Sequence, residues 1–236
     1  INFTGSESGT AAAGTDTVTF SEIEGFWLSN QADSVDGSAS TSAMAIGAGA
    51  GDDTIIGGSG ADAIAGQDGN DLIESGAGND SIDAGIGNDT VLGGAGDDLI
   101  YGQAGADSLS GGDGSDVVYG GTETDTIHGG AGDDILFGEA GDDHVGGGVG
   151  NDGIAGGAGN DRLHGEAGND TISGGIGNDA IFGGAGDDSV VGDAGDDHII
   201  GGDGADSLAS GDGNDYIHGD DSSRHDGSMS ERTASS

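Results

Sequence analysis

The sequence predicts an all-β fold, a right-handed parallel β-roll (a β-solenoid) in which two short sheets face each other. Three observations predict it. A nine-residue pattern repeats without insertion from Ala48 to His218, the sixth position of every repeat is Asp, and the eighth is Ile, Val or Leu. Gly93 to Tyr101, which reads Gly-Gly-Ala-Gly-Asp-Asp-Leu-Ile-Tyr, is a representative unit. A fixed short period of this kind indicates a solenoid, in which each repeat packs on its neighbours.

The repeat is strict over 171 residues, or 19 units. Its fourth position is Gly in every unit except that of Gly120 to His128, where Glu123 stands. A disordered Gly-rich segment is the alternative interpretation. Low complexity gives no reason for an acid and an aliphatic residue to stay in phase through 19 units, so the regularity favours a folded array.

Within one unit, six residues rich in Gly, Asp and Asn are expected to form a turn, and three residues around the aliphatic a very short strand. Strand side chains alternate, so the eighth position points inward and the seventh and ninth outward. Two units make one coil, and stacked coils align the aliphatics into two facing ladders. At about 4.8 Å per coil the roll would be roughly 45 Å long.

The pattern Gly-Gly-x-Gly-x-Asp-x-U-x, with U a large aliphatic, resembles the calcium-binding nonapeptide of the RTX (repeats-in-toxin) proteins. The resemblance covers residues 48–218 and implies a parallel roll with calcium in its turns. Toxins, proteases, lipases, epimerases and adhesins of that family share this roll. The resemblance therefore implies a kind of module and leaves the activity of the parent protein open.

Stacked turns place the sixth-position Asp residues of units n and n+2 close together, and such carboxylates repel each other without a counterion. Carboxylate and carbonyl oxygens, with no Cys and no His in the turn, suit calcium better than zinc or copper. An EF-hand, the competing calcium motif, needs flanking helices and a Glu that are missing here. Units n and n+2 pair, so 19 units allow at most 17 calcium sites.

By resemblance, each ion is held by Asp residues of stacked turns and by carbonyls of the Gly-rich positions. The expected carboxylate ligands are Asp53, Asp62, Asp71, Asp80, Asp89, Asp98, Asp107, Asp116, Asp125, Asp134, Asp143, Asp152, Asp161, Asp170, Asp179, Asp188, Asp197, Asp206 and Asp215. The expected carbonyl ligands are those of Gly94, Gly96, Gly112, Gly114, Gly130, Gly132, Gly157, Gly159, Gly175, Gly177, Gly184 and Gly186.

The amino-acid composition limits the kinds of molecule that the chain can bind. The chain has 45 acidic residues, three Arg, no Lys, no Cys and a formal net charge of -42. This charge excludes nucleic acid and anionic membranes as direct partners, and the absence of Lys argues against a phosphate loop. No apolar stretch approaches the length of a membrane span, so we expect no membrane insertion. With 57 Gly residues and little apolar area, the chain is expected to fold only when calcium binds.

Residues 1–47 do not fit the repeat and are expected to form an N-terminal cap with degenerate coils. Asp16 to Phe20 alternates as a strand, Asp33 and Val35 have the spacing of a repeat, and Phe26 and Trp27 are expected to pack rather than bind a ligand. Residues 219–236 are polar and are expected to be disordered. Since the chain begins at Ile1 and shows no signal peptide, we expect it to be a piece of a longer protein.

The irregular unit at Glu123 is expected to flank the weakest ion sites, because Glu is strained if its φ is positive. Alternatively, Glu123 adds a ligand and strengthens one of them. These sites would be shared with the units that start at Gly102 and Gly138.

Outward positions separate by sheet. Three consecutive coils of one sheet present a continuous apolar patch, which is a possible protein-partner surface or a stack that stabilises the roll. The patch consists of Leu99, Tyr101, Val117, Tyr119, Ile135 and Phe137. The opposite sheet carries every His of the repeats, expected as a solvated face that titrates near pH 6.5 rather than as a zinc site. These residues are His128, His144, His164, His198 and His218, with Arg162 among them.

The leading hypothesis is a noncatalytic, calcium-dependent structural module of a secreted or cell-surface bacterial protein, such as an adhesin exported by type I secretion. The alternative is the accessory roll of a larger RTX enzyme or toxin whose catalytic domain lies outside these residues. No catalytic Cys, no HExxH and no Ser, His and Asp set is present, so we expect no enzyme activity. Ice binding would need rows of Thr and Asn, but Thr occupies the third position only at Thr122.

Overall fold

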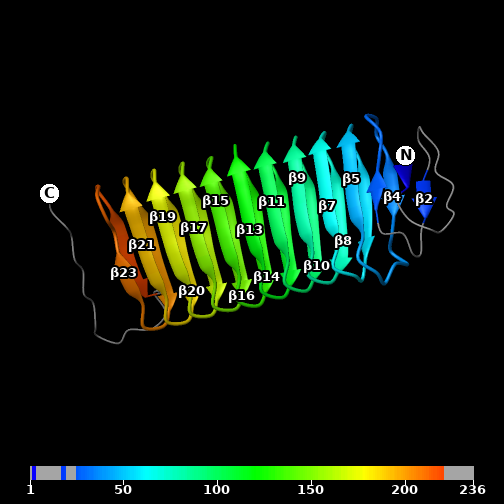
Figure 1. The fold of residues 1–236 in the computed structure, drawn as a ribbon. Coiled ribbons are helices and arrows are strands. Elements are labelled where there is room, and N and C mark those ends of the chain that lie inside the picture. The colour runs from blue at the N-terminus through cyan, green and yellow to red at the C-terminus, as the bar shows by residue number, and fades with distance from the viewer. Residues whose placement is uncertain (1, 4–16, 20–24, 221–236) are drawn as a thin grey trace.

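The fold is all-β over the residues described by the computed structural model, which are 2–3, 17–19 and 25–220. Within these residues, twenty-four strands form two 12-stranded sheets that stack along one axis, and the chain crosses from one sheet to the other after each strand (Figure 1). All neighbouring strands within a sheet are parallel, except that β1 pairs antiparallel with β3. The predicted parallel roll of two facing sheets is confirmed.

The odd-numbered strands make the first sheet. They are β1 (Asn2–Phe3), β3 (Phe26–Trp27), β5 (Ala45–Ala50), β7 (Ala63–Asp68), β9 (Ser81–Ile86), β11 (Leu99–Ala104), β13 (Val117–Thr122), β15 (Ile135–Ala140), β17 (Gly153–Ala158), β19 (Thr171–Ile176), β21 (Ser189–Ala194) and β23 (Ser207–Ala209).

The even-numbered strands make the second sheet. They are β2 (Thr17–Thr19), β4 (Ser34–Asp36), β6 (Thr54–Gly58), β8 (Leu72–Ala77), β10 (Thr90–Ala95), β12 (Ser108–Asp113), β14 (Thr126–Ala131), β16 (His144–Val149), β18 (Arg162–Ala167), β20 (Ala180–Ala185), β22 (His198–Asp203) and β24 (Tyr216–Asp220).

The strands are longer than the sequence predicts. A typical strand such as β11 has six residues and runs from position seven of one unit to position three of the next, which leaves only three residues for the turn. The expected three-residue strand was wrong because the Gly-rich positions also pair with the neighbouring coil, as Gln103 does with Gly121. Buried backbone groups need partners, and an extended glycine segment finds them one coil away.

The core is a double ladder of the eighth-position aliphatics. From Ile55 to Ile199 every one of them is at most 3% exposed, so the predicted inward row is confirmed. Leu208 and Ile217, in the last described coil, are only partly buried. Each unit contributes one large aliphatic residue, and the interior is therefore a single thin layer between the sheets.

The first coils continue this core outside the strict repeat. Val35 and Ile46 are buried, and Val35 pairs with Ile55 across a spacing of 20 residues instead of 18. Two extra residues between β4 and β5 explain the break in register. Trp27 does not pack inside a cap: it is 58% exposed, and its indole lies against Gly47 on the outer face.

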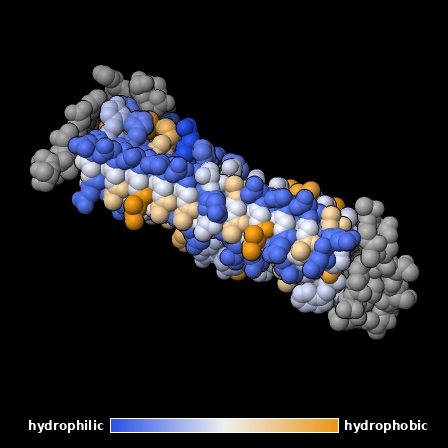
Figure 2. All heavy atoms as spheres, turned by 90° about the horizontal axis from the view of Figure 1, so that it is seen from above, coloured by the Kyte–Doolittle hydropathy of each residue, from blue (hydrophilic) through white to orange (hydrophobic). Residues whose placement is uncertain are grey.

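The surface is predominantly polar. On the side shown in Figure 2, hydrophilic residues form long stretches and hydrophobic residues are isolated spots. None of the described residues belongs to a helix that could span a membrane. Of residues 219–236, expected to be disordered, Gly219 and Asp220 belong to β24, so the prediction was wrong for these two. The residues from 221 onward lie outside the described ones.

Candidate metal centre

The sixth-position aspartates form two rows, one along each edge of the roll. Turns from the first sheet to the second carry the row that starts at Asp53, and turns in the other direction carry the row that starts at Asp62. The 17 aspartates from Asp53 to Asp197 are at most 3% exposed, whereas Asp206 and Asp215 are half-buried at the end. The structure therefore brings together the residues that the sequence predicts as ligands.

One oxygen of each carboxylate links two coils. Oδ1 of Asp116 accepts a hydrogen bond of 2.8 Å from the backbone N–H of Asp98, and the same bond recurs along both rows. Asp33 joins the first row, because its N–H donates to Oδ1 of Asp53 at 2.6 Å. In the second row the N–H of Met44 takes the equivalent place and donates to Asp62. The motif predicts the aspartates but not this bond, which requires two coils in register.

The other oxygen has no partner. In 16 described aspartates Oδ2 is fully buried without a hydrogen bond, from Asp53 to Asp197. Asp62 differs, because its Oδ2 accepts from the N–H of Gly58 at 3.1 Å. Burying an anionic oxygen without a partner costs several kcal/mol, on the order of the desolvation of a charged group. A regular row of such oxygens fits cations bound along the turns.

Where position one of the unit is glycine, the unpartnered oxygen faces that glycine. A Cβ on Gly138 would lie 2.5 Å from Oδ2 of Asp143 and 2.6 Å from the carbonyl oxygen of Gly156, one coil further on. A Cβ on Gly120 would likewise lie 2.5 Å from Asp125 Oδ2 and 2.8 Å from the Gly138 carbonyl. A carboxylate and a carbonyl oxygen thus face a space that only glycine leaves open, and hard oxygens are what calcium prefers.

The predicted carbonyl ligands occupy positions two and four. Nearly all of them point along the roll axis toward the glycine α-carbon of the next coil, as the Gly94 carbonyl does toward Gly112 and the Gly96 carbonyl toward Gly114. No three acidic, His or Cys side chains converge on one point in the part of the chain that the structure describes. A cation between two turns would take most of its oxygens from the backbone, and the ligand set stays a prediction.

The electrostatics of the rows oppose ionisation. The pKa of Asp98, Asp125 and Asp134 is raised to about 7, mainly by burial and also by neighbouring aspartates of the same row, while the backbone N–H bond opposes the shift. Burial likewise raises the pKa of Asp53 and Asp161 to about 6. A proton or a cation must compensate these carboxylates.

A second ladder runs along the exposed fifth position. Oδ1 of Asp52 accepts from the N–H of Asn70 at 2.9 Å, and Oδ1 of Asn70 accepts from the N–H of Asn88 at 2.8 Å. These bonds run in the opposite direction to those of the sixth position. Sequence reasoning missed this ladder. The frequent Asn and Asp residues at position five were the signal that could have predicted it.

Glu123 has a positive φ of 73°, which is the condition under which a Glu at position four is strained. Its Oε2 accepts from the N–H of Gly105 at 3.0 Å and from the hydroxyl of Thr122. The usual coil-to-coil bond at this place, from Gly105 N–H to the Thr122 carbonyl, is stretched to 3.4 Å. Glu123 therefore bridges two coils where the regular bond is weak. The strengths of the ion sites beside it stay predictions.

The outer faces carry the expected residues. Tyr101, Tyr119 and Phe137 stack with ring centroids 4.9 and 4.8 Å apart, which confirms the aromatic row. On the second sheet, Phe182 stacks on His164 at 4.6 Å, and Arg162 Nε donates to Nε2 of His164. Burial lowers the pKa of His164, and the nearby Arg162 lowers it further. His164 is therefore not the freely solvated group that the sequence predicts.

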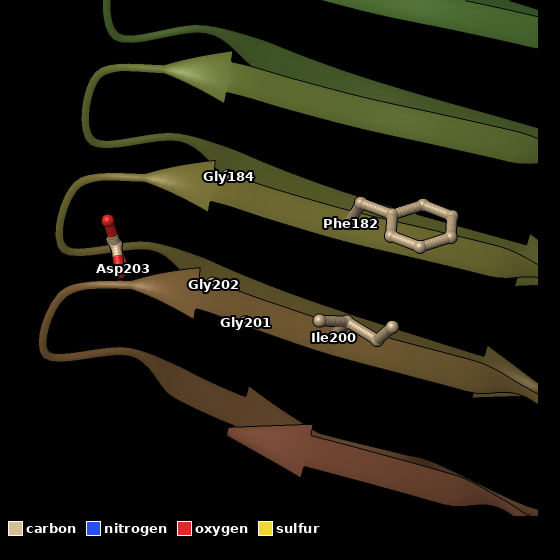
Figure 3. Close-up of a pocket in the computed structure, with 6 residues that line it drawn as sticks. All are labelled: Phe182, Gly184, Ile200, Gly201, Gly202 and Asp203. Atoms are coloured by element: carbon tan, nitrogen blue, oxygen red, sulfur yellow. The ribbon is translucent and has the colours of Figure 1, made fainter. Parts of the chain in front are cut away.

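The second sheet also has a shallow hollow of about 260 Å³. Phe182 and Ile200 point outward from neighbouring strands, and glycines beside them leave the space open (Figure 3). Its six lining residues are Phe182, Gly184, Ile200, Gly201, Gly202 and Asp203. Asp203 is the one ionisable side chain among them.

Two parallel sheets joined by turns with unpartnered carboxylates define a β-solenoid whose turns are suited to hard cations. The sequence model of the RTX calcium-binding nonapeptide repeat matches residues 47–82, 83–118, 119–154, 155–190 and 191–223. The chain therefore belongs to the family of RTX calcium-binding nonapeptide-repeat proteins, whose repeats bind calcium. The comparison with curated proteins gives no match.

Proposed function

We propose that this chain is a noncatalytic structural module that folds when it meets calcium outside the cell, within a secreted or cell-surface bacterial protein. The single observation that supports it most strongly is the row of 16 buried carboxylate oxygens without partners. Without a cation these groups destabilise the roll. In a calcium-poor cytosol the chain would be an expanded polyanion, suited to export before folding.

The net charge of -42 supports the same order of events. Like charges at this density keep an unfolded chain extended and soluble, and they oppose the compact state until cations neutralise them. Calcium binds the folded state and not the unfolded one, so the calcium concentration determines stability by mass action.

A second candidate is the accessory roll of a larger RTX enzyme or toxin. The family match favours it equally, because it covers the repeats and says nothing of other domains. The parent gene separates the two: a neighbouring catalytic domain supports the accessory roll, and tandem adhesive domains support the structural module.

Calcium titration followed by circular dichroism tests the proposed folding. We expect a coil spectrum at pH 7.5 in chelator and a cooperative gain of β signal in millimolar calcium. Magnesium should fail, because it demands a smaller and more rigid octahedron. A full β signal in chelator at this pH would contradict the proposal.

A further inference from the structure

We propose that a turn takes calcium only if position one of its repeat is glycine, and that the turns of Ala48, Ser75, Ala84 and Ser210 therefore do not. This inference rests on the proposed calcium-dependent folding and goes further, since it assigns individual turns. Fifteen of the 19 units have glycine at position one, and these four do not.

The geometry at position one supports this assignment. In the glycine units, the space above the α-carbon is bordered by the unpartnered Oδ2 of the unit's own aspartate and by a carbonyl of the next coil, as at Gly138. A methyl or hydroxymethyl group would fill that space and come between the two oxygens. Calcium binds its oxygens at 2.3–2.6 Å, so roughly one added carbon is enough to exclude it.

Ser75 shows what a side chain does there. Its hydroxyl is buried and donates to the carbonyl oxygen of Gly93 at 2.6 Å. This carbonyl is the counterpart of the one that faces Asp143 from Gly156. In the unit of Ser75 the carbonyl is already satisfied by a neutral donor, while Oδ2 of Asp80 stays without a partner. Ala48 and Ala84 are also fully buried, and each carries a methyl at the same position.

The substitutions are not imposed by the backbone. Position one lacks the positive φ of positions two and four, as at Gly93, Gly138 and Gly156. Ala and Ser therefore fit the local conformation, and what they change is the space around the carboxylate oxygen. Glycine is needed here for access and not for its conformational freedom.

The assignment predicts how many turns of one chain bind calcium. Sixteen aspartates have an unpartnered Oδ2, and three of them, Asp53, Asp80 and Asp89, belong to the units of Ala48, Ser75 and Ala84. Thirteen turns remain, against the 17 that the repeat count allows. The other two glycine turns are left out because Oδ2 of Asp62 already accepts from Gly58 N–H and because Asp206 is only half-buried at the end of the roll. Twelve of them follow one another without interruption in the units from Gly93 to Gly192.

The number of calcium ions bound per chain tests the inference, measured by native mass spectrometry and by equilibrium dialysis in millimolar calcium. We expect thirteen for the unmodified chain. The double variant Ser75→Gly and Ala84→Gly should bind two more, and Gly156→Ser should bind one fewer. Because the first variant gains ions, its result cannot come from misfolding.

Gly153→Ala is the matched control. Gly153 lies at position seven, and the nearest atom to an added Cβ there is the Asp134 carbonyl oxygen at 3.8 Å. The count should stay at thirteen. An unchanged count in both the gain and the loss variants would overturn the inference while leaving calcium binding intact. A chain that binds no calcium at all would overturn the proposed function as well.

Discussion

At the scale of the residue, the two oxygens of one carboxylate have different roles. Oδ1 of Asp134 accepts from the N–H of Asp116 at 2.8 Å and joins two coils, while Oδ2 is buried without a partner. Its neighbour Asp133 is exposed and accepts from Asn151. Charge is therefore needed at position six, whereas an acceptor suffices at position five, where Asn is also common.

Asp134→Asn separates these roles. The amide keeps the acceptor for Asp116 N–H but removes the charge, and we expect the calcium-loaded roll to lose about 3 kcal/mol of unfolding free energy, as when one partner of a buried ion pair is removed. Asp134→Ala should cost about 1 kcal/mol more, because the coil bond is lost too. Urea unfolding in millimolar calcium measures both.

Asp133→Asn is the matched control for charge, with an expected change within about 0.5 kcal/mol. Asp215→Asn should also cost less than Asp134→Asn, since Asp215 is half-buried at the end of its row. Equal losses at Asp133 and Asp134 would contradict a cation shared between stacked position-six carboxylates.

Glu123 gives a second test at this scale. Glu123→Ala keeps a side chain at φ 73° but removes the bond to Gly105 N–H, so strain is left without compensation. Glu123→Gly removes both the hydrogen bond and the strain. We expect the Ala variant to be less stable than the Gly variant by about 1 kcal/mol, the cost of a left-handed residue with a Cβ. Thermal unfolding of the calcium-loaded chain measures the order, and the reverse order would show that φ is not strained there.

At the scale of the strand, outward aromatic side chains stack along the roll axis. Tyr119 of β13 lies between Tyr101 of β11 and Phe137 of β15, with planes within 11° of parallel. The sequence leaves open whether this apolar patch binds a partner or stabilises the roll. The close stacking supports a stabilising role and does not test a partner.

Tyr119→Ala should therefore lower the free energy of unfolding more than the loss of a ring at one end of the stack does. It removes two stacked contacts, each worth about 0.5–1.5 kcal/mol, whereas Tyr101→Ala removes one. We expect the first variant to lose about twice the unfolding free energy of the second in urea melts with calcium. Leu92→Ala, at the same position nine of its repeat but on the second sheet and 44% exposed, serves as the control. Equal losses for all three variants would show that stacking adds nothing.

At the scale of the whole molecule, stability depends on what neutralises the carboxylates. Asp98, Asp125 and Asp134 have pKa values of about 7 in the roll, raised by burial and by their row neighbours. In the unfolded chain an Asp titrates near 4. The metal-free roll therefore holds protons that the unfolded chain releases, and its stability falls as the pH rises from about 4 to 7.

In chelator we accordingly expect β signal at pH 5 that is lost by pH 7.5. Calcium should reverse the dependence, because the ion displaces protons and binds more tightly as the pH rises through 6 and 7. Circular dichroism across this range, with and without calcium, measures both trends. A chelated chain that gains order between pH 5 and 7.5 would contradict the pKa shifts of the aspartate rows.

The sequence by itself determined the parallel roll, the inward row from Ile55 to Ile199 and the aspartate rows along both edges. These follow from a period that is local and strict, so each unit specifies its own turn and its own core residue. It also placed Tyr101, Tyr119 and Phe137 on one face, because 18-residue spacing brings equivalent positions into register.

Only the tertiary structure decided what each oxygen contacts. The coil bond of Asp116, the bridge from Glu123 to Gly105 and the hydroxyl of Ser75 on the Gly93 carbonyl all join residues about one coil apart. The strand length was wrong for the same reason, since positions two and three pair across coils. A nine-residue motif describes a single turn, whereas these contacts arise where two turns are stacked at a fixed separation.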